Sequence, residues 1–185
     1  MKALSFASSN AHKFSEVCQI LTVYNISVEF ACLELTEIQA DDLEPIAAGK
    51  AREASRRLGA TAFVEDAGLF IKHLQGFPGP YSAYVFRTLG IKGILRILQE
   101  EKDRRAQFQS VIGYCEPGAE PRCFSASVDG TIAPVPRGNG WGYDPIFIPD
   151  DADGLTFGEL DQAKNNLSHR RKSLQILAEY LVGPK

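Results

Sequence analysis

The chain has 185 residues, a length that suits one domain over residues 1–185 and allows a sizeable apolar core. Its composition, 44% hydrophobic and 23% charged with a formal net charge of −3, gives no basic field, so binding to long nucleic acid is not expected. No segment approaches the roughly 18 apolar residues of a membrane span, and the N-terminal apolar run is too short for a signal peptide, so we expect a cytoplasmic protein.

Strands and helices alternate in the first half of the chain. The run "KALSFAS" predicts a buried strand, and apolar residues recur at helical spacing from Asn10 to about Tyr24. A strand over "SVEFACLEL", a helix over 43–58 and a third strand over "TAFVEDAGLFI" are predicted to follow.

The second half begins with the loop "QGFPGPYSAY" and a predicted helix from about Ile91 to Glu100. The alternating segments "AQFQSVIGYCE" and "RCFSASVDGTIA" then predict an antiparallel hairpin. The last helix is expected to begin at Ser168 as its N-cap. This order favours the α/β class, a mixed sheet flanked by helices. The four cysteines lack metal-ligand spacing, and we interpret them as reduced thiols.

A phosphate-binding turn is one interpretation of "SSNAHKFSE". Hydroxyl and amide side chains after a strand, helix N-terminal amides and a lysine one turn later would make a compact cradle for phosphate. The alternative is that Ser9 or Asn10 only caps a helix and Lys13 is solvated. The spacing of a P-loop is absent.

Three carboxylates could bind a metal, namely Glu37 in "LTEIQ" and two acids of a predicted strand. Glu65 and Asp66 lie in a strand that otherwise reads as buried, and because they are adjacent they must point to opposite faces. Coordination of Mg²⁺ by one or two carboxylates together with substrate phosphates would offset the cost of burying a charge. A salt bridge at a strand end remains the alternative. Lys50 could reach the same phosphates or could be an ordinary surface lysine.

The loop "GNGWGYDPIF" places glycines around Trp141, whose ring could stack on a planar base. The tryptophan could equally belong to the core. In "KNNLSHRRKSL", donors from Ser168, His169 and Arg170 at a helix start suit the O6 and N7 acceptors of a 6-oxopurine and disfavour adenine. The alternative is a serine N-cap followed by cations that face solvent.

These motifs together resemble the inosine triphosphate pyrophosphatase family, the nonstandard purine NTP pyrophosphatases, from about Ser5 to Leu181. The resemblance implies hydrolysis of ITP, dITP and XTP to the monophosphate and pyrophosphate, which removes deaminated purines from the nucleotide pool. It also implies Mg²⁺, with Mn²⁺ as a substitute, a homodimer, and an elongated α/β domain whose mixed, twisted sheet divides into two lobes around a nucleotide cleft.

The resemblance also assigns residues. Those matching the triphosphate-binding motif are Ser8, Ser9, Asn10, Ala11, His12 and Lys13. Glu37 and Asp66 match the metal-binding acids, and Asp66 also matches the general base, with Lys50 as a second catalytic residue. Those matching the base-binding set are Trp141, Gly142, Tyr143, Asp144, Lys164, Ser168, His169 and Arg170.

Three positions depart from the common pattern. Ala67 stands where the family usually has Ser or Thr, which removes one hydroxyl from the substrate-binding set and costs about 0.5 to 1.5 kcal/mol for a lost hydrogen bond. Tyr84 stands where many bacterial members have arginine and resembles archaeal-type members, and Trp141 replaces the commoner Phe. Two other functions remain open, namely a module that binds purine triphosphates without hydrolysing them and a pyrophosphatase for modified pyrimidine or methylated nucleotides.

Overall fold

The computed structural model describes residues 4–183, apart from the side chain of Gln162. Seven strands form one sheet in the order β2-β1-β3-β5-β6-β7, and β4 pairs with β3. The strands are β1 (Leu4–Ser8), β2 (Val28–Cys32), β3 (Ala62–Ile71), β4 (Pro78–Gly79), β5 (Arg105–Cys115), β6 (Arg122–Ile132) and β7 (Phe147–Pro149). Pairing is parallel for β1 with β2 and β3, and antiparallel for β3 with β4 and for β6 with β7. The predicted mixed sheet is confirmed.

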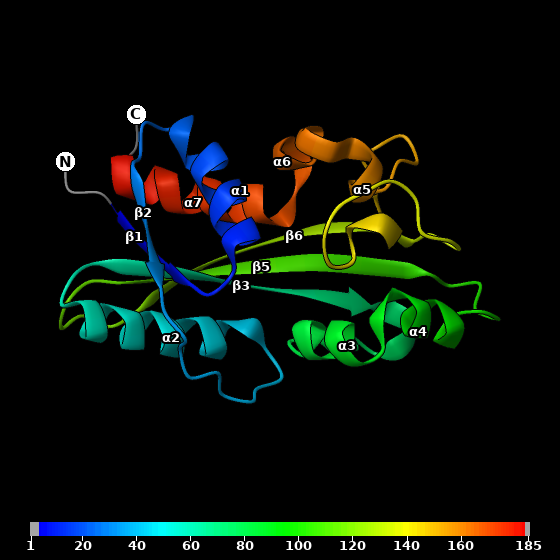
Figure 1. Ribbon diagram of the computed structural model, residues 1–185, viewed down its shortest axis with the longest axis horizontal. Helices are drawn as coiled ribbons and strands as arrows, with labels where there is room; N and C mark the ends of the chain where they lie inside the picture. Colours follow the sequence, from blue (N-terminus) through cyan, green and yellow to red (C-terminus); the bar gives the residue numbers. More distant parts are fainter. Residues whose placement is uncertain (1–3, 184–185) are drawn as a thin grey trace. The chain divides into compact units, whose positions relative to one another are not determined.

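Helices and strands alternate from β1 to β3, and three helices follow the last strand (Figure 1). The α-helices are α1 (Ala11–Thr22), α2 (Leu43–Leu58), α3 (Ser82–Thr88), α4 (Gly90–Ile97), α5 (Phe157–Leu160), α6 (Lys164–Leu167) and α7 (His169–Val182). Short 3₁₀ turns are η1 (Lys72–Leu74), η2 (Asp144–Ile146) and η3 (Asp161–Ala163). Within residues 4–183, no helix combines the length and the apolar character that crossing a bilayer requires.

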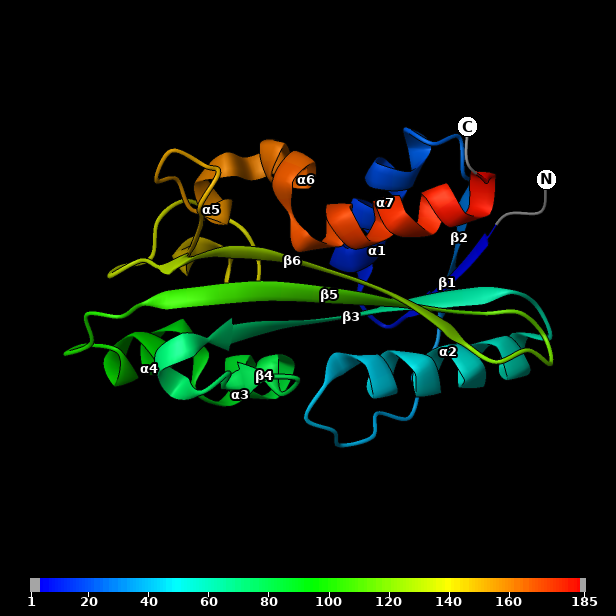
Figure 2. The same ribbon diagram turned by 180° about the vertical axis from the view of Figure 1, so that it is seen from behind.

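The chain folds into two compact units, and β3, β5 and β6 each continue from one unit into the other. Among the described residues, the first unit contains 4–66, 110–126 and 170–183. In it α1 and α7 cover one face of the strands and α2 covers the other (Figures 1 and 2). Its core packs aromatic and aliphatic side chains from β1, α1, β3, β5 and α7, including Phe6, Leu21, Phe63, Ile112 and Leu177.

The second unit contains residues 67–109 and 127–169. Here α3 and α4 lie on one face of the strands and α5 and α6 on the other (Figures 1 and 2). It has a core of its own, which includes Leu69, Ile94, Phe108, Phe147 and Phe157. Each unit therefore buries its own apolar side chains, and the order of the elements along the chain brings residues distant in sequence into each of them.

Two predicted elements differ from the observed ones. The strand predicted over "SVEFACLEL" ends at Cys32, because the backbone of Glu34 and Thr36 bonds to side chains of α2 instead of to another strand. The helix predicted from Ile91 to Glu100 is α4, which ends at Ile97; beyond it, the Leu98 carbonyl accepts a hydrogen bond from Arg104 at 2.6 Å. The helix over 43–58 is confirmed at both ends.

Candidate active site

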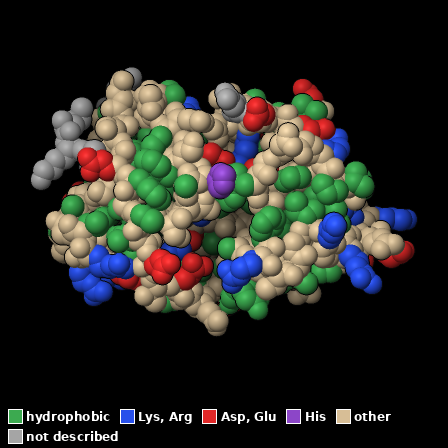
Figure 3. Space-filling view, viewed as in Figure 1, with side chains coloured by type: hydrophobic (Ala, Val, Ile, Leu, Met, Phe, Trp, Pro, Cys, Tyr) green, Lys and Arg blue, Asp and Glu red, His purple; other side chains and the backbone are tan. Residues whose placement is uncertain are grey.

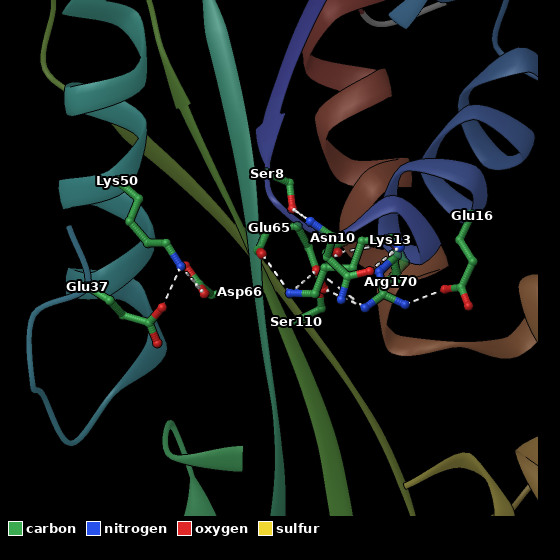
Figure 4. A network of polar contacts seen from close by, with 11 residues as sticks. Ser8, Asn10, Lys13, Glu16, Glu37, Lys50, Glu65, Asp66, Ser110 and Arg170 are labelled. Atoms are coloured by element: carbon green, nitrogen blue, oxygen red, sulfur yellow. Dashed lines mark hydrogen bonds and ion pairs between the residues drawn. The ribbon is translucent and has the colours of Figure 1, made fainter. Parts of the chain in front are cut away.

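The first group of predicted residues lies beside one face of β3, which carries Asp66. Lys50, on α2, donates to Asp66 Oδ1 at 2.8 Å and to Glu37 Oε2 at 3.0 Å, so that one ammonium joins both carboxylates (Figure 4). The side chains of Lys50 and Asp66 are 15% and 11% exposed, whereas that of Glu37 is 55% exposed. The surface alternative for Lys50 is therefore wrong, and the structure brings the three residues together.

The second carboxylate oxygen of Asp66 has a special position. Oδ2 is buried and has no hydrogen-bond partner among residues 4–183. A buried, unpaired carboxylate oxygen is costly, and a bound cation or a water molecule would offset that cost. Two carboxylates also match the few protein ligands that Mg²⁺ accepts when phosphates and water complete its coordination. No cluster of three or more metal-ligating side chains occurs in the described part of the chain, so the residues fit a metal shared with a ligand.

The charge of Lys50 is secured by its partners. Burial by itself lowers the pKa of this lysine, but Asp66 and Glu37 together outweigh burial and raise the pKa above its ordinary value. The ammonium therefore remains protonated at neutral pH, ready to face an anionic group.

The opposite face of β3 carries Glu65, whose side chain is fully buried. Lys13 Nζ lies 2.8 Å from Glu65 Oε2 and also donates to the Glu65 backbone carbonyl at 2.9 Å. Ser110 donates to Glu65 Oε1 at 2.8 Å, and its hydroxyl lies 2.9 Å from that of Ser173. As strand alternation predicted, the adjacent acids Glu65 and Asp66 point to opposite sides (Figure 4).

Arg170 closes this second network. Its side chain is 1% exposed, lies 3.2 Å from Glu65 Oε1 and donates to Glu16 on α1. Burial alone lowers the pKa of Arg170, but Glu65 and Glu16 raise it, so the guanidinium stays charged. The structure thus places Arg170 in the first unit with Lys13 and Glu65, whereas the other predicted base-binding residues belong to the second unit.

The turn before α1 has the geometry of a helix cap. Ser8 Oγ accepts from the Asn10 amide at 3.0 Å, and Asn10 Oδ1 accepts from the Lys13 amide at 3.1 Å. Asn10 is therefore the N-cap of α1. Three further residues of the motif, Ser9, Ala11 and His12, are exposed at the start of this helix. Solvation of Lys13, the other part of the alternative, is wrong, because this lysine is paired with Glu65.

In the second unit, Lys164 links two residues of the predicted base-binding loop. Its ammonium lies 2.8 Å from Asp144 Oδ2, and both side chains are buried. The same ammonium lies 5.4 Å from the ring centroid of Trp141. Trp141 is half-buried, which leaves part of its ring accessible for stacking. A buried ion pair beside a partly exposed aromatic ring can bind a planar polar group.

Three other residues of the predicted base-binding set are buried. Tyr143 belongs to the core of the second unit and donates its hydroxyl to the Ser82 carbonyl at 3.1 Å. His169 stacks on Phe108, with ring centroids 4.5 Å apart and an angle of 8° between the planes. Ser168 is buried directly before α7, where its backbone is extended, as an N-cap requires. The alternative that cations at this helix start face solvent is therefore wrong for His169 and Arg170.

The glycines before Trp141 allow close backbone packing. At Gly138, φ is +69°, and a Cβ would lie 2.3 Å from the backbone carbon of Gly158. Gly142, directly after Trp141, also has a positive φ, of +64°. Outside this loop, Ala67 lies half-buried on β3 beside Asp66 and has no hydroxyl to offer a ligand. The loop conformation therefore depends on glycine where the chain contacts α5, and also at Gly140, where a Cβ would lie 2.9 Å from the Cβ of Asp144.

Sequence reasoning missed the partners of Glu65. Glu16, Ser110 and Ser173 each contact Glu65 or Arg170, yet nothing in their own local patterns marks them. The one available signal was the acid itself, because a carboxylate in an apolar strand demands a cation and a donor. Phe108, which stacks on His169, gave no local signal either.

Comparison with known proteins gives consistent results. A family model described as the Ham1 family matches residues 4–180. A protein of Methanopyrus kandleri named dITP/XTP pyrophosphatase is 52% identical over 97% of this chain and 96% of its own length. A protein of Methanosarcina mazei with the same name is 45% identical and covers 99% of both chains.

Solved structures agree with these sequence matches. The Staphylococcus aureus Ham1 protein is 31% identical, covers all of both chains and superposes with a TM-score of 0.84. A Ham1 protein from Coxiella burnetii is 32% identical, covers 98% of this chain and 99% of its own, and also has a TM-score of 0.84. The similarity spans nearly the whole chain in sequence and in fold, and the protein belongs to the Ham1 family.

Proposed function

We propose that this protein is a nucleoside triphosphate pyrophosphohydrolase that converts ITP, dITP and XTP to the monophosphate and pyrophosphate. The observation that carries the proposal is the unpaired, buried Oδ2 of Asp66 beside the ammonium of Lys50. Relatives named dITP/XTP pyrophosphatase over nearly the full length support this choice of reaction and substrate. Through it, the protein would remove deaminated purines from the nucleotide pool.

The reaction needs water to attack the α-phosphorus and pyrophosphate to leave. Asp66 is the proposed general base, because Oδ2 has a free acceptor site and Oδ1 is already held by Lys50. The proton of the attacking water passes to this oxygen as the new P–O bond forms and the bond to the β-phosphate oxygen breaks. Lys50 stabilises negative charge on the phosphates, and Lys13 does so at the start of α1.

Glu37 and Asp66 are the proposed ligands of Mg²⁺, for which Mn²⁺ could substitute. Their carboxylates share Lys50, and the two acids come from different segments of the first unit. When bound, the cation would withdraw charge from the phosphate oxygens and the leaving group. Two protein carboxylates are sufficient if the triphosphate and water supply the other ligands.

The second unit offers residues for the base. Trp141 would stack on the purine, with Lys164 held in place by Asp144 beside the ring. Ser168 and His169 would donate to O6 and N7 of a 6-oxopurine. Adenine shares the N7 acceptor but carries an amino donor in place of O6, so it would lose one of these hydrogen bonds. A role for Arg170 in base binding stays a prediction, since its guanidinium already contacts two carboxylates.

Assembly and location complete the proposal. We expect a homodimer acting in the cytoplasm, in keeping with the family resemblance. Exposed aromatic side chains over residues 77–89, namely Phe77, Tyr81, Tyr84 and Phe86, support this segment as the contact surface.

Steady-state release of pyrophosphate tests the function directly. With Mg²⁺ present, ITP, dITP and XTP should react at least about a hundredfold more efficiently than ATP, GTP or a pyrimidine triphosphate, about 3 kcal/mol of discrimination. Tight ITP binding without turnover in Mg²⁺ or Mn²⁺ would instead identify a binding module. Equal rates with a modified pyrimidine triphosphate would contradict the assignment of the base.

A further inference from the structure

Three polar residues of α2 form a stripe along the segment that carries Glu37. Lys50, Glu53 and Arg57 are spaced three and four residues apart, so they share one face of the helix. They contact Glu37, Thr36 and Glu34, in that order. Residues 33–42 run between β2 and α2 without regular structure (Figure 1). The stripe therefore holds an irregular segment whose last contacted residue is the proposed metal ligand.

Glu53 is the centre of this stripe, because its two carboxylate oxygens serve different partners. Oε2 accepts the backbone N–H of Thr36 at 2.9 Å, and Oε1 lies 3.2 Å from Arg57 Nη1. Arg57 Nη1 in turn donates to the Glu34 carbonyl at 2.6 Å. The N–H of Thr36 and the side chain of Arg57 hold the pKa of Glu53 below its ordinary value, with the backbone hydrogen bond as the main cause. Glu53 is thus ionised at neutral pH and accepts a charge-assisted hydrogen bond.

Burial does not hold Glu37 in place. Its side chain is more than half exposed, and the exposed acids Asp41 and Asp42 follow in the same segment, with Glu44 at the start of α2. Figure 3 shows acidic side chains gathered low on this face of the molecule. Repulsion among these acids would move an unanchored segment away from its neighbours. Lys50 binds the carboxylate itself, and the backbone bond at Thr36, one residue before Glu37, is the nearest contact that holds the main chain of the segment.

We propose that Glu53, supported by Arg57, is a positioning residue that fixes the backbone at Thr36 so that Glu37 stays ready to bind a divalent cation with Asp66. The inference rests on the proposed function, since it takes Glu37 as a metal ligand. Glu53 itself contacts neither Asp66 nor Lys50 through any bond that the structure shows. Residues that orient metal ligands in this indirect way commonly change metal affinity about 10- to 100-fold when they are replaced.

The test measures Mn²⁺ binding to the nucleotide-free protein, from the electron paramagnetic resonance signal of the free ion. Glu53→Ala removes the acceptor for Thr36, and we expect its Kd for Mn²⁺ to be at least about tenfold higher than that of the wild type. Glu53→Gln keeps an acceptor and should bind Mn²⁺ within about twofold of the wild type. Arg57→Ala should weaken binding in the same direction but less, because it leaves the bond to Thr36 intact.

A matched control separates anchoring from charge. Glu44→Ala removes an exposed acid from the same helix without touching the segment 34–37 and should bind Mn²⁺ almost as the wild type does. Amide hydrogen exchange, followed by NMR, should become faster at Thr36 in Glu53→Ala only. Equal Mn²⁺ affinity in Glu53→Ala and the wild type would overturn the positioning role, as would an equal loss in Glu53→Gln.

The same experiment distinguishes this inference from the proposed function. If the wild type binds no Mn²⁺ without nucleotide, the positioning role fails; the metal part of the proposed function fails as well only if pyrophosphate release from ITP does not depend on Mg²⁺ or Mn²⁺. If the wild type binds Mn²⁺ and all Glu53 variants bind it equally well, the function survives and only the role of Glu53 is lost.

Discussion

At the scale of single residues, Glu65 and Asp66 show how one strand separates stability from chemistry. Both acids are buried and adjacent, yet they face opposite sides of β3. Glu65 has every oxygen engaged by Lys13, Arg170 or Ser110, whereas Asp66 keeps one oxygen unpaired. A fully paired carboxylate is typical of structure, and an unpaired one of function.

Asp66→Asn should therefore remove turnover and leave binding largely intact. The amide cannot accept the proton of the attacking water, and loss of a general base lowers kcat about 10²- to 10⁴-fold. The change keeps the size of the side chain, so ITP should still bind in an equilibrium titration. Normal hydrolysis of ITP by this variant would show that Asp66 is not the base.

Glu65→Ala is the informative comparison, because it alters the neighbouring residue on the other face. It removes Glu65 from the buried guanidinium of Arg170, which keeps its contact with Glu16. Breaking a buried ion pair from one side costs about 3 to 5 kcal/mol. Urea denaturation should show this loss for Glu65→Ala and a smaller one for Asp66→Asn, because Lys50 keeps its contact with Glu37 and the amide oxygen can still accept a hydrogen bond.

At the scale of elements, long segments could be predicted from local pattern and short ones could not. The 16 residues of α2 repeat apolar positions often enough to define both ends. In contrast, α3 lies in a stretch rich in glycine and proline, and the Ser82 hydroxyl secures its start by donating to the Gly79 carbonyl at 2.7 Å and accepting from the Leu69 amide at 2.8 Å. The contact with Leu69 joins residues 13 apart, which no local pattern contains.

In the candidate site, too, contacts between residues near in sequence could be predicted and contacts between distant residues could not. Ser8, Asn10 and Lys13 are near in sequence, and their cap geometry follows from the turn itself. Arg170 pairs with Glu65 across 105 residues, and this contact depends on tertiary packing that sequence motifs do not encode. Local motifs therefore identified the chemical groups, and the fold decided which of them meet.

The loop before η2 allows a prediction at the element scale. In Gly138→Ala the new Cβ would meet the backbone of Gly158 at 2.3 Å, so the loop that carries Trp141 must move. We expect a lower melting temperature and a higher KM for ITP. Gly118→Ala is the matched control, because its φ of +76° is similar but nothing lies within 4 Å of the added Cβ.

The control should be destabilised only by the strain of alanine in a left-handed conformation, about 1 to 2 kcal/mol, and its KM for ITP should be unchanged. Thermal unfolding and steady-state kinetics on the two variants separate backbone strain from displacement of the loop. Equal effects of the two substitutions on KM would contradict a role for this loop in holding the base.

At the scale of the whole molecule, the exposed aromatic side chains of residues 77–89 call for a partner surface. Tyr84 is 59% exposed and Leu89 is 48% exposed, and Phe77, Tyr81 and Phe86 are exposed in the same segment of the second unit. A monomer in water gains nothing by exposing so many large apolar groups close together in sequence. Association of two copies would remove them from solvent, since a twofold interface uses the same patch on both chains.

Light scattering coupled to size-exclusion chromatography measures this association. The wild type should have twice the mass of one chain at micromolar concentration, and Tyr84→Glu should shift it toward one chain, because an ionised carboxylate in an apolar interface is costly. Val23→Glu, which places the same charge on an exposed apolar residue of the first unit, should leave the mass at two chains. A wild type that has the mass of one chain, or a Tyr84→Glu variant that remains paired, would show that this segment does not hold two copies together.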